Sequence, residues 1–209
     1  LEARDGNIYL KNSPKPVLTV AQVASESIVK RGRTITSRAT YSPPNTSPPD
    51  AKTGYGNYCP TYAYGAHAAE VEVDPETGKV KVLRVTAVHD VGRAINPLIL
   101  EGQVDGGVSM GIGYALLENL QWKDGRTLNP SFCTYKIVNA PDMPPVQTRF
   151  IETDDPLGPF GAKGIGEPTT IPTAPAIANA IANAIGVRIK DLPITPDKII
   201  LALKEKKGK

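Results

Sequence analysis

A glycine-rich stretch with the other features of a long helix restricts the fold of this chain more than any other part of it. Asn96 and Pro97 form a typical N-cap and first-turn pair. The predicted helix continues to about Leu120, which makes it roughly 35 Å long at about 1.5 Å per residue. Each interior glycine costs about 1 kcal/mol relative to alanine. The glycines in question are Gly102, Gly106, Gly107, Gly111 and Gly113. We therefore expect some neighbour to require this smooth surface.

One face of the predicted helix combines an amide side chain with a surface partly cleared of side chains. On helical spacing this face carries Gln103, Gly107, Met110 and Tyr114. A flat polar ligand would fit against such a face. Close packing of the glycines against a strand or a second helix explains the same pattern, and the sequence leaves both explanations open.

A second glycine cluster lies in the segment 161–170 and carries one carboxylate, Glu167. Gly161, Gly164 and Gly166 can turn successive N–H groups toward an anion, but their spacing matches neither the P-loop nor the dinucleotide fingerprint. Ordinary loops seldom concentrate glycine in this way unless something must approach the backbone. Glu167 is then either a functional carboxylate or an exposed loop residue or cap, and spacing does not decide between them.

The rest of the chain alternates short strands with helices, and it lacks a regular β-α-β order, so we expect the α+β class. The predicted elements are a hairpin at 1–14, a helix at 19–29, an extended proline-rich segment at 31–56, a hairpin at 66–87 with its turn at 74–78, a turn at 124–125, strands at 131–138 and 147–153, a helix through 177–185 that Gly186 ends, and a last helix that begins at Thr195 and Pro196. We expect a first region at residues 1–50 and a second at residues 51–209.

The composition excludes several kinds of site. Two cysteines and two histidines are too few for a disulfide framework, a zinc site or an iron-sulfur cluster, so any metal must arrive with its own ligands. We interpret Cys59 and Cys133 as small buried hydrophobic residues. The net charge of +3 and the short basic run at 204–209 predict no nucleic-acid surface. Since no signal peptide or apolar run of about 20 residues is present, we expect a cytoplasmic protein without a membrane segment.

Four motifs in a fixed order resemble one known family. They are Asp90–Pro97, Glu101–Gly107, Gly111–Glu118 and Ala162–Pro168. Together they are similar to the C-terminal part of the molybdenum-binding subunit of the xanthine dehydrogenase and aldehyde oxidase family. The resemblance continues through 69–82 and 195–199 and covers most of the chain from about Lys52. It implies that residues 51–209 are the C-terminal half of a molybdopterin-binding domain.

The resemblance assigns roles to both glycine-rich segments. In the family the glutamate of the Gly-x-Gly-Glu-Pro loop, here Glu167, is the active-site base. The glutamine of the Glu-Gly-Gln motif, here Gln103, contacts the pterin cofactor. Burial beside the cofactor should raise the pKa of Glu167 and make it a better base. We expect further cofactor contacts from Gly107, Lys163, Gly164, Ile165 and Gly166, with Lys163 pointing away from the base or meeting a phosphate.

The implied chemistry is the oxidation of a small molecule with water as the oxygen source. The substrate would be an aromatic N-heterocycle, an aldehyde or an aryl-CoA compound. Molybdenum in this family is held by the dithiolene sulfurs of molybdopterin, so the protein needs no metal ligands of its own. The segments 37–44 and 54–62 are most similar to the bacterial branch that includes hydroxybenzoyl-CoA reductase and nicotinate dehydrogenase, which implies the cytosine dinucleotide form of the cofactor.

The resemblance also implies partners, because the family's molybdenum subunit is much longer than 209 residues. The chain is either a fragment or works beside a second chain that completes the subunit. Iron-sulfur clusters and FAD are expected on other domains or subunits, so the assembly would be a hetero-oligomer. The alternative is a non-catalytic module of the same fold that binds a phosphate-bearing ligand or a partner chain. A nucleotide-binding domain that uses the glycine loops is a third, weaker hypothesis.

Three smaller predictions concern polar and aromatic residues near the motifs. Asp90 and Arg93 are expected to pair and fix the loop before the long helix. His89, at a strand end, is expected to be a satisfied polar residue. A tyrosine cluster before the second hairpin can line a substrate channel or pack on a strand; its members are Tyr55, Tyr58, Tyr62 and Tyr64.

Overall fold

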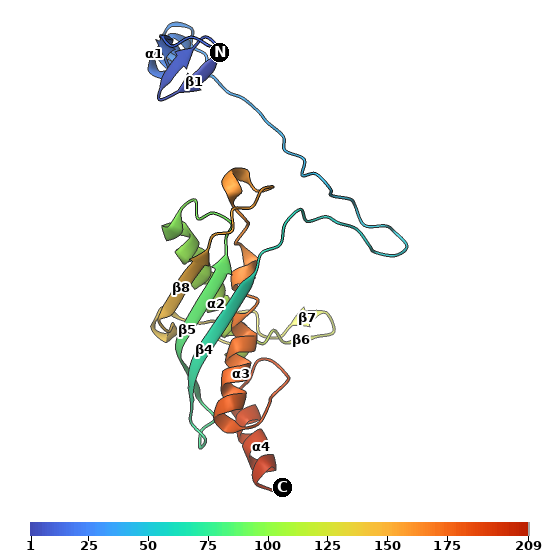
Figure 1. Ribbon diagram of the computed structural model, residues 1–209. Helices are drawn as coiled ribbons and strands as arrows, with labels where there is room; N and C mark the ends of the chain where they lie inside the picture. The colour runs from blue at the N-terminus through green and yellow to red at the C-terminus, as the bar shows by residue number, and fades with distance from the viewer. Residues whose placement is uncertain (209) are drawn as a thin grey trace. The chain divides into compact units, whose positions relative to one another are not determined.

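The computed structural model describes residues 1–208. The chain forms two compact units, Leu1–Pro43 and Pro44–Lys209 (Figure 1). The family resemblance lies mostly in the second unit, which also contains all four motifs.

The first unit is a small antiparallel sheet followed by a short helix. Its strands lie in the order β1-β2-β3, and the predicted hairpin at 1–14 is confirmed. Thr19 caps the following helix, because its hydroxyl accepts the Gln22 N–H while the Gln22 side chain accepts the Thr19 N–H. The elements are β1 (Glu2–Arg4), β2 (Asn7–Tyr9), β3 (Pro16–Thr19), α1 (Val20–Ser25) and a π-helical continuation, η1 (Glu26–Lys30).

The segment between the two sheets is extended, as its prolines predicted. Residues 31–64, all of them described, contain no helix and no strand, and a single isolated bridge pairs Ser47 with Asn57. Most of these residues are exposed, including Cys59. Cys133 is exposed as well, so the expectation that both cysteines are buried was wrong. Both lie in irregular segments that do not pack on a core.

A three-stranded sheet forms the frame of the second unit. β4 (Gly65–Val73) and β5 (Val80–Asp90) are antiparallel, and β8 (Val146–Ile151) pairs with β5 in parallel. The predicted hairpin and the strand at 147–153 are therefore confirmed. The turn at 74–78 is closed by the Asp74 carboxylate, which accepts the N–H groups of Glu76 and Thr77.

Helices cover one face of this sheet. α2 (Pro97–Leu116) lies in the crossover from β5 to β8, and its first turn is capped by the Asn96 side chain, as predicted. α3 (Thr173–Ile185) runs along β4 (Figure 1) and ends where Gly186 adopts a left-handed conformation. α4 (Pro196–Lys207) is the last helix. The mixture of one sheet and segregated helices is the predicted α+β class.

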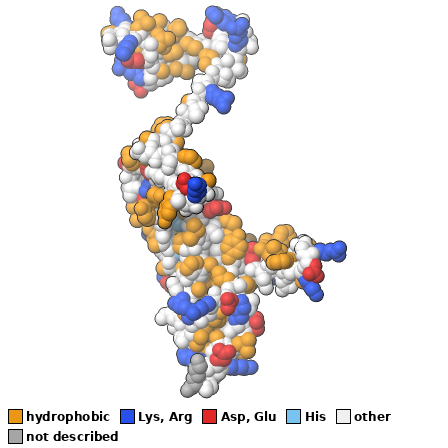
Figure 2. Space-filling model, turned by 90° about the vertical axis from the view of Figure 1, so that its right-hand side faces the viewer, with side chains coloured by type: hydrophobic (Ala, Val, Ile, Leu, Met, Phe, Trp, Pro, Cys, Tyr) orange, Lys and Arg blue, Asp and Glu red, His pale blue; other side chains and the backbone are white. Residues whose placement is uncertain are grey.

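The core lies between the sheet and helices α2 and α3. Its fully buried apolar side chains include Val85 and Ala87 of β5, Val104, Val108 and Ala115 of α2, Ile177 and Ile181 of α3, and Ile199 of α4. Many other large apolar side chains stay outside it, and Figure 2 shows them over much of the face in view. Among the described residues, none of the helices combines the length and apolar character that a bilayer crossing requires.

One predicted strand is absent. Residues 131–138 form turns, in which Thr134 and Tyr135 donate their N–H groups to the Ser131 carbonyl. The Tyr135 hydroxyl donates to Glu118, two residues after the end of α2, so this segment has a side-chain contact instead of a strand partner. The remaining short elements are β6 (Trp122–Lys123) and β7 (Arg126–Thr127), which form a hairpin, and three 3-10 turns, η2 (Ala140–Asp142), η3 (Pro159–Gly161) and η4 (Glu167–Thr169).

Candidate functional site

The loop that carries Glu167 rests on the residues that follow β5. The Lys163 N–H donates to the Val91 carbonyl at 2.8 Å. Gly92 has a φ of +65°, and a Cβ added there would lie 2.3 Å from the Gly161 carbonyl oxygen. Only glycine tolerates both the conformation and this contact. The structure therefore brings the Asp90–Pro97 motif and the Ala162–Pro168 motif together.

A nearly buried ion pair fastens the same contact. The Lys163 ammonium lies 2.7 Å from the Asp90 carboxylate, and the two side chains are 11% and 9% exposed. Lys163 also donates to the Tyr62 carbonyl at 3.1 Å. Asp90 additionally accepts the Gly92 N–H and the Thr153 hydroxyl. Burial alone would raise the pKa of Asp90, but the Lys163 ammonium and these two donors together hold that pKa below its usual range.

This pairing corrects one expectation from the sequence and gives the protein partners of a second residue. Asp90 was expected to pair with Arg93, but its partner is Lys163, and Arg93 is exposed. Lys163 was expected to contribute to the cofactor site while pointing away from the base or meeting a phosphate, and in the described chain its ammonium is engaged by Asp90 and by the Tyr62 carbonyl. In this arrangement Lys163 fastens the loop that carries Glu167 to Asp90 and Tyr62.

Two threonines pack on helix α2: Thr169, in the turn η4 that begins at Glu167 (the Glu167 turn), and Thr173, the first residue of α3. A Cβ added at Gly107 would lie 1.9 Å from the Thr169 hydroxyl oxygen, and one added at Gly111 would lie 2.3 Å from the Thr173 Cβ. Both threonines are fully buried. For these two glycines the packing explanation is correct, and Gly107, which was expected beside the cofactor, lies under Thr169.

In the first half of α2 the glycines are not packed against a neighbour. A Cβ added at Gly102 or Gly106 would meet no atom within 4 Å. Gln103 lies between these two glycines and is exposed. The smooth surface of this half is therefore open in the described chain.

The backbone of the Glu167 loop is also accessible. A Cβ added at Gly164 or Gly166 would meet no atom within 4 Å. In the described chain, the N–H groups of Gly164, Ile165 and Gly166 have no hydrogen-bond acceptor. The Ile165 side chain is only 8% exposed and packs into the core. The loop is thus anchored by one apolar side chain while three successive N–H groups are left available.

Glu167 is the first residue of η4, and its side chain is exposed. The burial that was expected for this carboxylate is therefore absent within the described chain. The backbone around it is nevertheless fixed, because the Glu167 carbonyl accepts the Thr170 N–H at 2.9 Å and the Thr169 hydroxyl donates to the Gly166 carbonyl at 3.0 Å.

A histidine pair that sequence analysis did not connect with the site lies behind the two threonines. His67 Nε2 and His89 Nε2 are 2.8 Å apart, and His67 Nδ1 is 2.9 Å from the Thr173 hydroxyl. Burial lowers the pKa of His67 to about 4 and also lowers the pKa of His89. His89 was expected to be fully satisfied, but its Nδ1 is buried without a partner. In the sequence, His67 and His89 fall on the same face of the predicted hairpin, and this shared face could have predicted that they lie close together.

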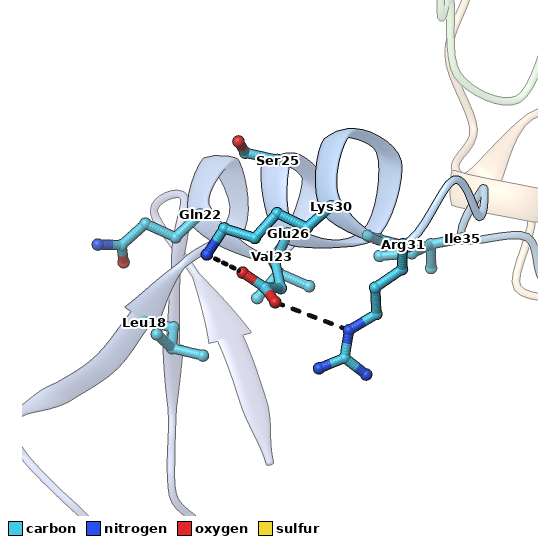
Figure 3. A pocket seen from close by; sticks show the side chains of 9 residues that line it. Leu18, Gln22, Val23, Ser25, Glu26, Lys30, Arg31 and Ile35 are labelled. Carbon is cyan, nitrogen blue, oxygen red and sulfur yellow. Dashed lines mark ion pairs between the residues drawn. The ribbon is translucent and has the colours of Figure 1, made fainter.

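A groove in the first unit contains none of the motif residues. It has a volume of about 780 Å³. Within it, Glu26 lies 2.7 Å from Lys30 and 3.7 Å from Arg31 (Figure 3). Its charges are therefore paired internally. In the described chain, no group of three or more histidine, cysteine, aspartate or glutamate side chains is arranged to hold a metal.

Comparison with known proteins identifies a consistent set of relatives. Residues 1–144 match the family model described as a molybdopterin cofactor-binding domain. The chain is 35% identical over 199 residues to the xanthine dehydrogenase molybdenum-binding subunit of Escherichia coli O157:H7, an alignment that covers 93% of this chain and 25% of that protein. It is 41% identical over 149 residues to the nicotine 6-hydroxylase large subunit of Paenarthrobacter nicotinovorans, covering 69% and 18% respectively.

A solved structure gives the same result. The aldehyde oxidoreductase from Desulfovibrio desulfuricans ATCC 27774 superposes with a TM-score of 0.74 at 34% identity, over 90% of this chain and 20% of that one. The chain thus spans a quarter or less of the length of these proteins. The family match begins at residue 1, so it extends N-terminal to the stretch from about Lys52 that carried most of the resemblance.

Proposed function

Because the chain belongs to the molybdopterin cofactor-binding domain family of xanthine dehydrogenases and aldehyde oxidoreductases, we propose that it forms part of a molybdenum hydroxylase active site and presents Glu167 there as the base. The proposal assigns two roles to this chain. The open half of α2 and the Glu167 loop bind the cofactor, and the Glu167 carboxylate accepts a proton during the reaction.

The observation that carries the proposal is the contact between α2 and the Glu167 turn. Thr169 sits on Gly107, Gln103 lies about one helical turn before Gly107, and Glu167 lies two residues before Thr169. The amide and the carboxylate therefore flank the same contact, although they are far apart in the sequence. This juxtaposition supports a single site for both.

The groups available at this contact fit molybdopterin. Gln103 offers an amide, and the N–H groups of the loop from Gly164 to Gly166 are unpaired in the described chain. The open glycines let a planar polar ligand come close to both elements. The described chain has no cluster of metal-binding side chains, so a metal here would have to be held by the sulfurs of its cofactor.

Molybdopterin, which we propose in its cytosine dinucleotide form, supplies the redox chemistry through its molybdenum when bound. The chain's own contribution is positional and acid-base. Ile165 and the Asp90–Lys163 pair fix the loop, the loop N–H groups and Gln103 orient the cofactor, and Glu167 takes up the proton of the attacking oxygen nucleophile. Lys163 and Gly107 act indirectly, because their side-chain positions are occupied by protein contacts.

The proposed substrate is an aromatic N-heterocycle, an aldehyde or an aryl-CoA compound. Nicotine 6-hydroxylase and aldehyde oxidoreductase are relatives whose names support the first two classes. Glu167 is exposed in this chain, so the rest of the molybdenum subunit must cover it to exclude water. Further subunits or domains with iron-sulfur clusters and FAD would remove the electrons, which makes the assembly a hetero-oligomer.

The test is Glu167→Gln in the complete protein, isolated with its partner chains. We expect kcat to fall by at least about 100-fold, the usual contribution of a general base, while the molybdenum content stays unchanged. Glu72→Gln, which alters an exposed carboxylate on β4, is the matched control and should turn over normally. Full turnover by Glu167→Gln would show that the base lies elsewhere.

The exposure of Glu167 favours a second candidate function, a non-catalytic module of the same fold that binds a phosphate-bearing ligand or a partner chain. The two candidates differ in metal content. Elemental analysis and pterin fluorescence on protein purified from its natural source should find about one molybdenum per chain for the hydroxylase. An absence of molybdenum from the natural complex would favour the module.

A further inference from the structure

We propose that His67 and His89 are positioning residues, which hold the Glu167 turn through a directed chain of hydrogen bonds and do so only as neutral imidazoles. The inference rests on the proposed function for its catalytic consequence. The hydrogen-bond chain itself is argued from the geometry alone.

The two histidines lie on the helix-covered face of the sheet. In the β4–β5 register Gly65 is opposite His89 and His67 is opposite Ala87, so the histidines are diagonal neighbours on one face. Their rings meet edge to face, with centroids 4.9 Å apart and an interplanar angle of 88°. His89 is only 1% exposed.

A continuous series of hydrogen bonds leads from this pair to the Glu167 turn. After the 2.8 Å contact between the two Nε2 atoms, His67 Nδ1 lies 2.9 Å from the Thr173 hydroxyl. The Thr173 hydroxyl donates to the Thr169 carbonyl at 3.4 Å. The Thr169 hydroxyl in turn donates to the Gly166 carbonyl at 3.0 Å, directly before Glu167.

The bond from the Thr173 hydroxyl to the Thr169 carbonyl determines which atom donates in each of the preceding hydrogen bonds. Since the Thr173 hydroxyl gives its proton to the Thr169 carbonyl, it accepts from His67 Nδ1–H. His67 Nε2 is then an unprotonated acceptor, and His89 Nε2–H is its donor. His89 Nδ1 is left as an unprotonated acceptor, consistent with its having no partner. The two histidines therefore carry opposite tautomers.

This arrangement tolerates no added proton. Protonation of His67, with His89 in this tautomer, would place two N–H groups against each other at 2.8 Å, and no carboxylate of the described chain forms an ion pair with either histidine. The neighbouring groups are Gly65 and Ala69 of β4, Phe150 of β8 and Thr173 of α3, all uncharged. The Asp90–Lys163 pair follows His89 but belongs to the opposite face of the strand. The depressed pKa of His67 agrees with this account.

The opposite wall of the turn is formed by α2. Thr169 packs on Gly107 and Thr173 packs on Gly111. The turn therefore lies between the glycines of α2 on one side and the histidine pair on the other. The two Nε2 atoms are 2.8 Å apart, a hydrogen-bonding distance that is shorter than the roughly 3.3 Å between two imidazole nitrogens on one zinc ion at about 2.0 Å each.

The experiment compares two substitutions of His89 in the complete protein with its partner chains. His89→Gln keeps a donor in place of Nε2–H but takes up no proton, whereas His89→Leu removes the donor. In His89→Leu we expect the amide hydrogens of Thr170 and Thr173, which are hydrogen-bonded in this segment, to exchange about 5- to 10-fold faster, since one hydrogen bond is worth about 1 kcal/mol or more. We expect kcat to fall with KM unchanged, and His89→Gln to restore both rates.

The controls separate this inference from the proposed function. Thr86→Val, on the other face of β5, should leave loop exchange and kcat as in the wild type. Unchanged loop exchange in His89→Leu would overturn the inference. Faster exchange with normal kcat would uphold the hydrogen-bond chain and contradict Glu167 as the base.

A measurement on the wild-type protein keeps the inference testable should His89→Leu not fold. Exchange of the imidazole C2 hydrogens, followed by mass spectrometry between pH 4 and 8, reports the titration of each histidine in a large complex. We expect neither histidine to show a midpoint near its ordinary pKa of about 6.5. A midpoint near that value for either histidine would overturn the claim that both are neutral.

Discussion

At the scale of single residues, the site depends on which polar groups are already engaged by the protein. Lys163 has the appearance of a ligand-binding cation, because it lies in a glycine-rich loop. Its ammonium is nevertheless held by Asp90 and the Tyr62 carbonyl. The residues left available for a ligand are therefore Gln103 and the backbone of the loop. Under the proposed function, this charged side chain fixes the loop and does not contact the ligand directly.

The importance of this ion pair can be measured by removing its cation. Lys163→Met leaves the Asp90 carboxylate nearly buried and without its cation, so we expect the free energy of unfolding to fall by about 3 kcal/mol, the lower end of the range for broken buried pairs. Arg84→Met is the matched control. It breaks the exposed pair with Glu70 on the same sheet, which should cost less than about 1 kcal/mol. Urea unfolding followed by circular dichroism measures both, and equal losses would contradict the assignment.

The histidine pair predicts a dependence of stability on pH. His67 has a pKa of about 4 in the folded chain and about 6.5 when unfolded. Above pH 6.5 neither state binds the proton, so the full stability is present. Between about pH 6.5 and 4 the unfolded state binds it first, and the free energy of unfolding should fall with decreasing pH.

Urea titrations at several pH values test this, with His67→Gln as the comparison. The variant cannot take up the proton, so its stability should vary less across this window. The lowered pKa of Asp90 acts in a different window, since its contribution is lost only as the pH falls below the ordinary carboxyl range. Identical pH profiles for wild type and variant would refute the prediction.

At the scale of secondary-structure elements, the two halves of α2 have different surfaces. In its second half, the absence of side chains at Gly107 and Gly111 lets Thr169 and Thr173 pack directly on the helix backbone. Its first half, at Gly102 and Gly106, is open. The cost of several helix glycines thus has two different causes. Gly107 and Gly111 let the Glu167 turn and the start of α3 come close to the helix axis, whereas Gly102 and Gly106 are proposed to let the cofactor come close.

Two adjacent glycines distinguish these causes. Gly106→Ala meets no atom within 4 Å and should raise the free energy of unfolding by about 0.5 to 1 kcal/mol through helix propensity. Gly107→Ala would place a Cβ 1.9 Å from the Thr169 hydroxyl, so we expect a loss of about 1 to 3 kcal/mol from overpacking. Thermal unfolding monitored by circular dichroism measures the difference. Shifts of the same sign would contradict the division of the helix.

At the scale of the whole molecule, the chain is two compact units joined by a long extended stretch. The first unit is a small sheet and helix without fully buried side chains on α1 or η1. The second contains the core, the motifs and the interlocked turn. Glu167 and several large apolar side chains of α2 are exposed, among them Leu98 and Ile99. Under the proposed function, the rest of the molybdenum subunit covers these surfaces.

Limited proteolysis tests the division of the chain into units. Trypsin should cut the 209-residue chain first after Arg33 or Arg38, because the described backbone there is exposed and outside any helix or strand. The fragment that begins after the cut should resist further digestion longer than the residues before it. Mass spectrometry of the early products identifies the sites. First cuts inside α2 or the β4–β5 hairpin would contradict the predicted order.

The sequence alone determined the elements whose signals are local. Asn96 and Pro97 begin α2, Gly186 ends α3, and the Asp74 turn joins β4 to β5, because each signal acts on backbone groups within a few residues. The order of the four motifs identified the family, and with it the roles proposed for Glu167 and Gln103. The strand expected at 131–138 failed, since strand-forming residues need a partner strand and this segment is held by turns instead.

Only the tertiary structure decided which residues meet. Lys163 and Asp90 are 73 positions apart, and His67 and Thr173 are 106 apart. No local propensity reports such a pairing, because the choice of partner depends on how the sheet and helices pack. The same packing buries Gly107 and leaves Gly106 open, although the two are neighbours with identical side chains. Sequence thus fixes the parts and their chemistry, while the packing of distant segments assigns each part its neighbour.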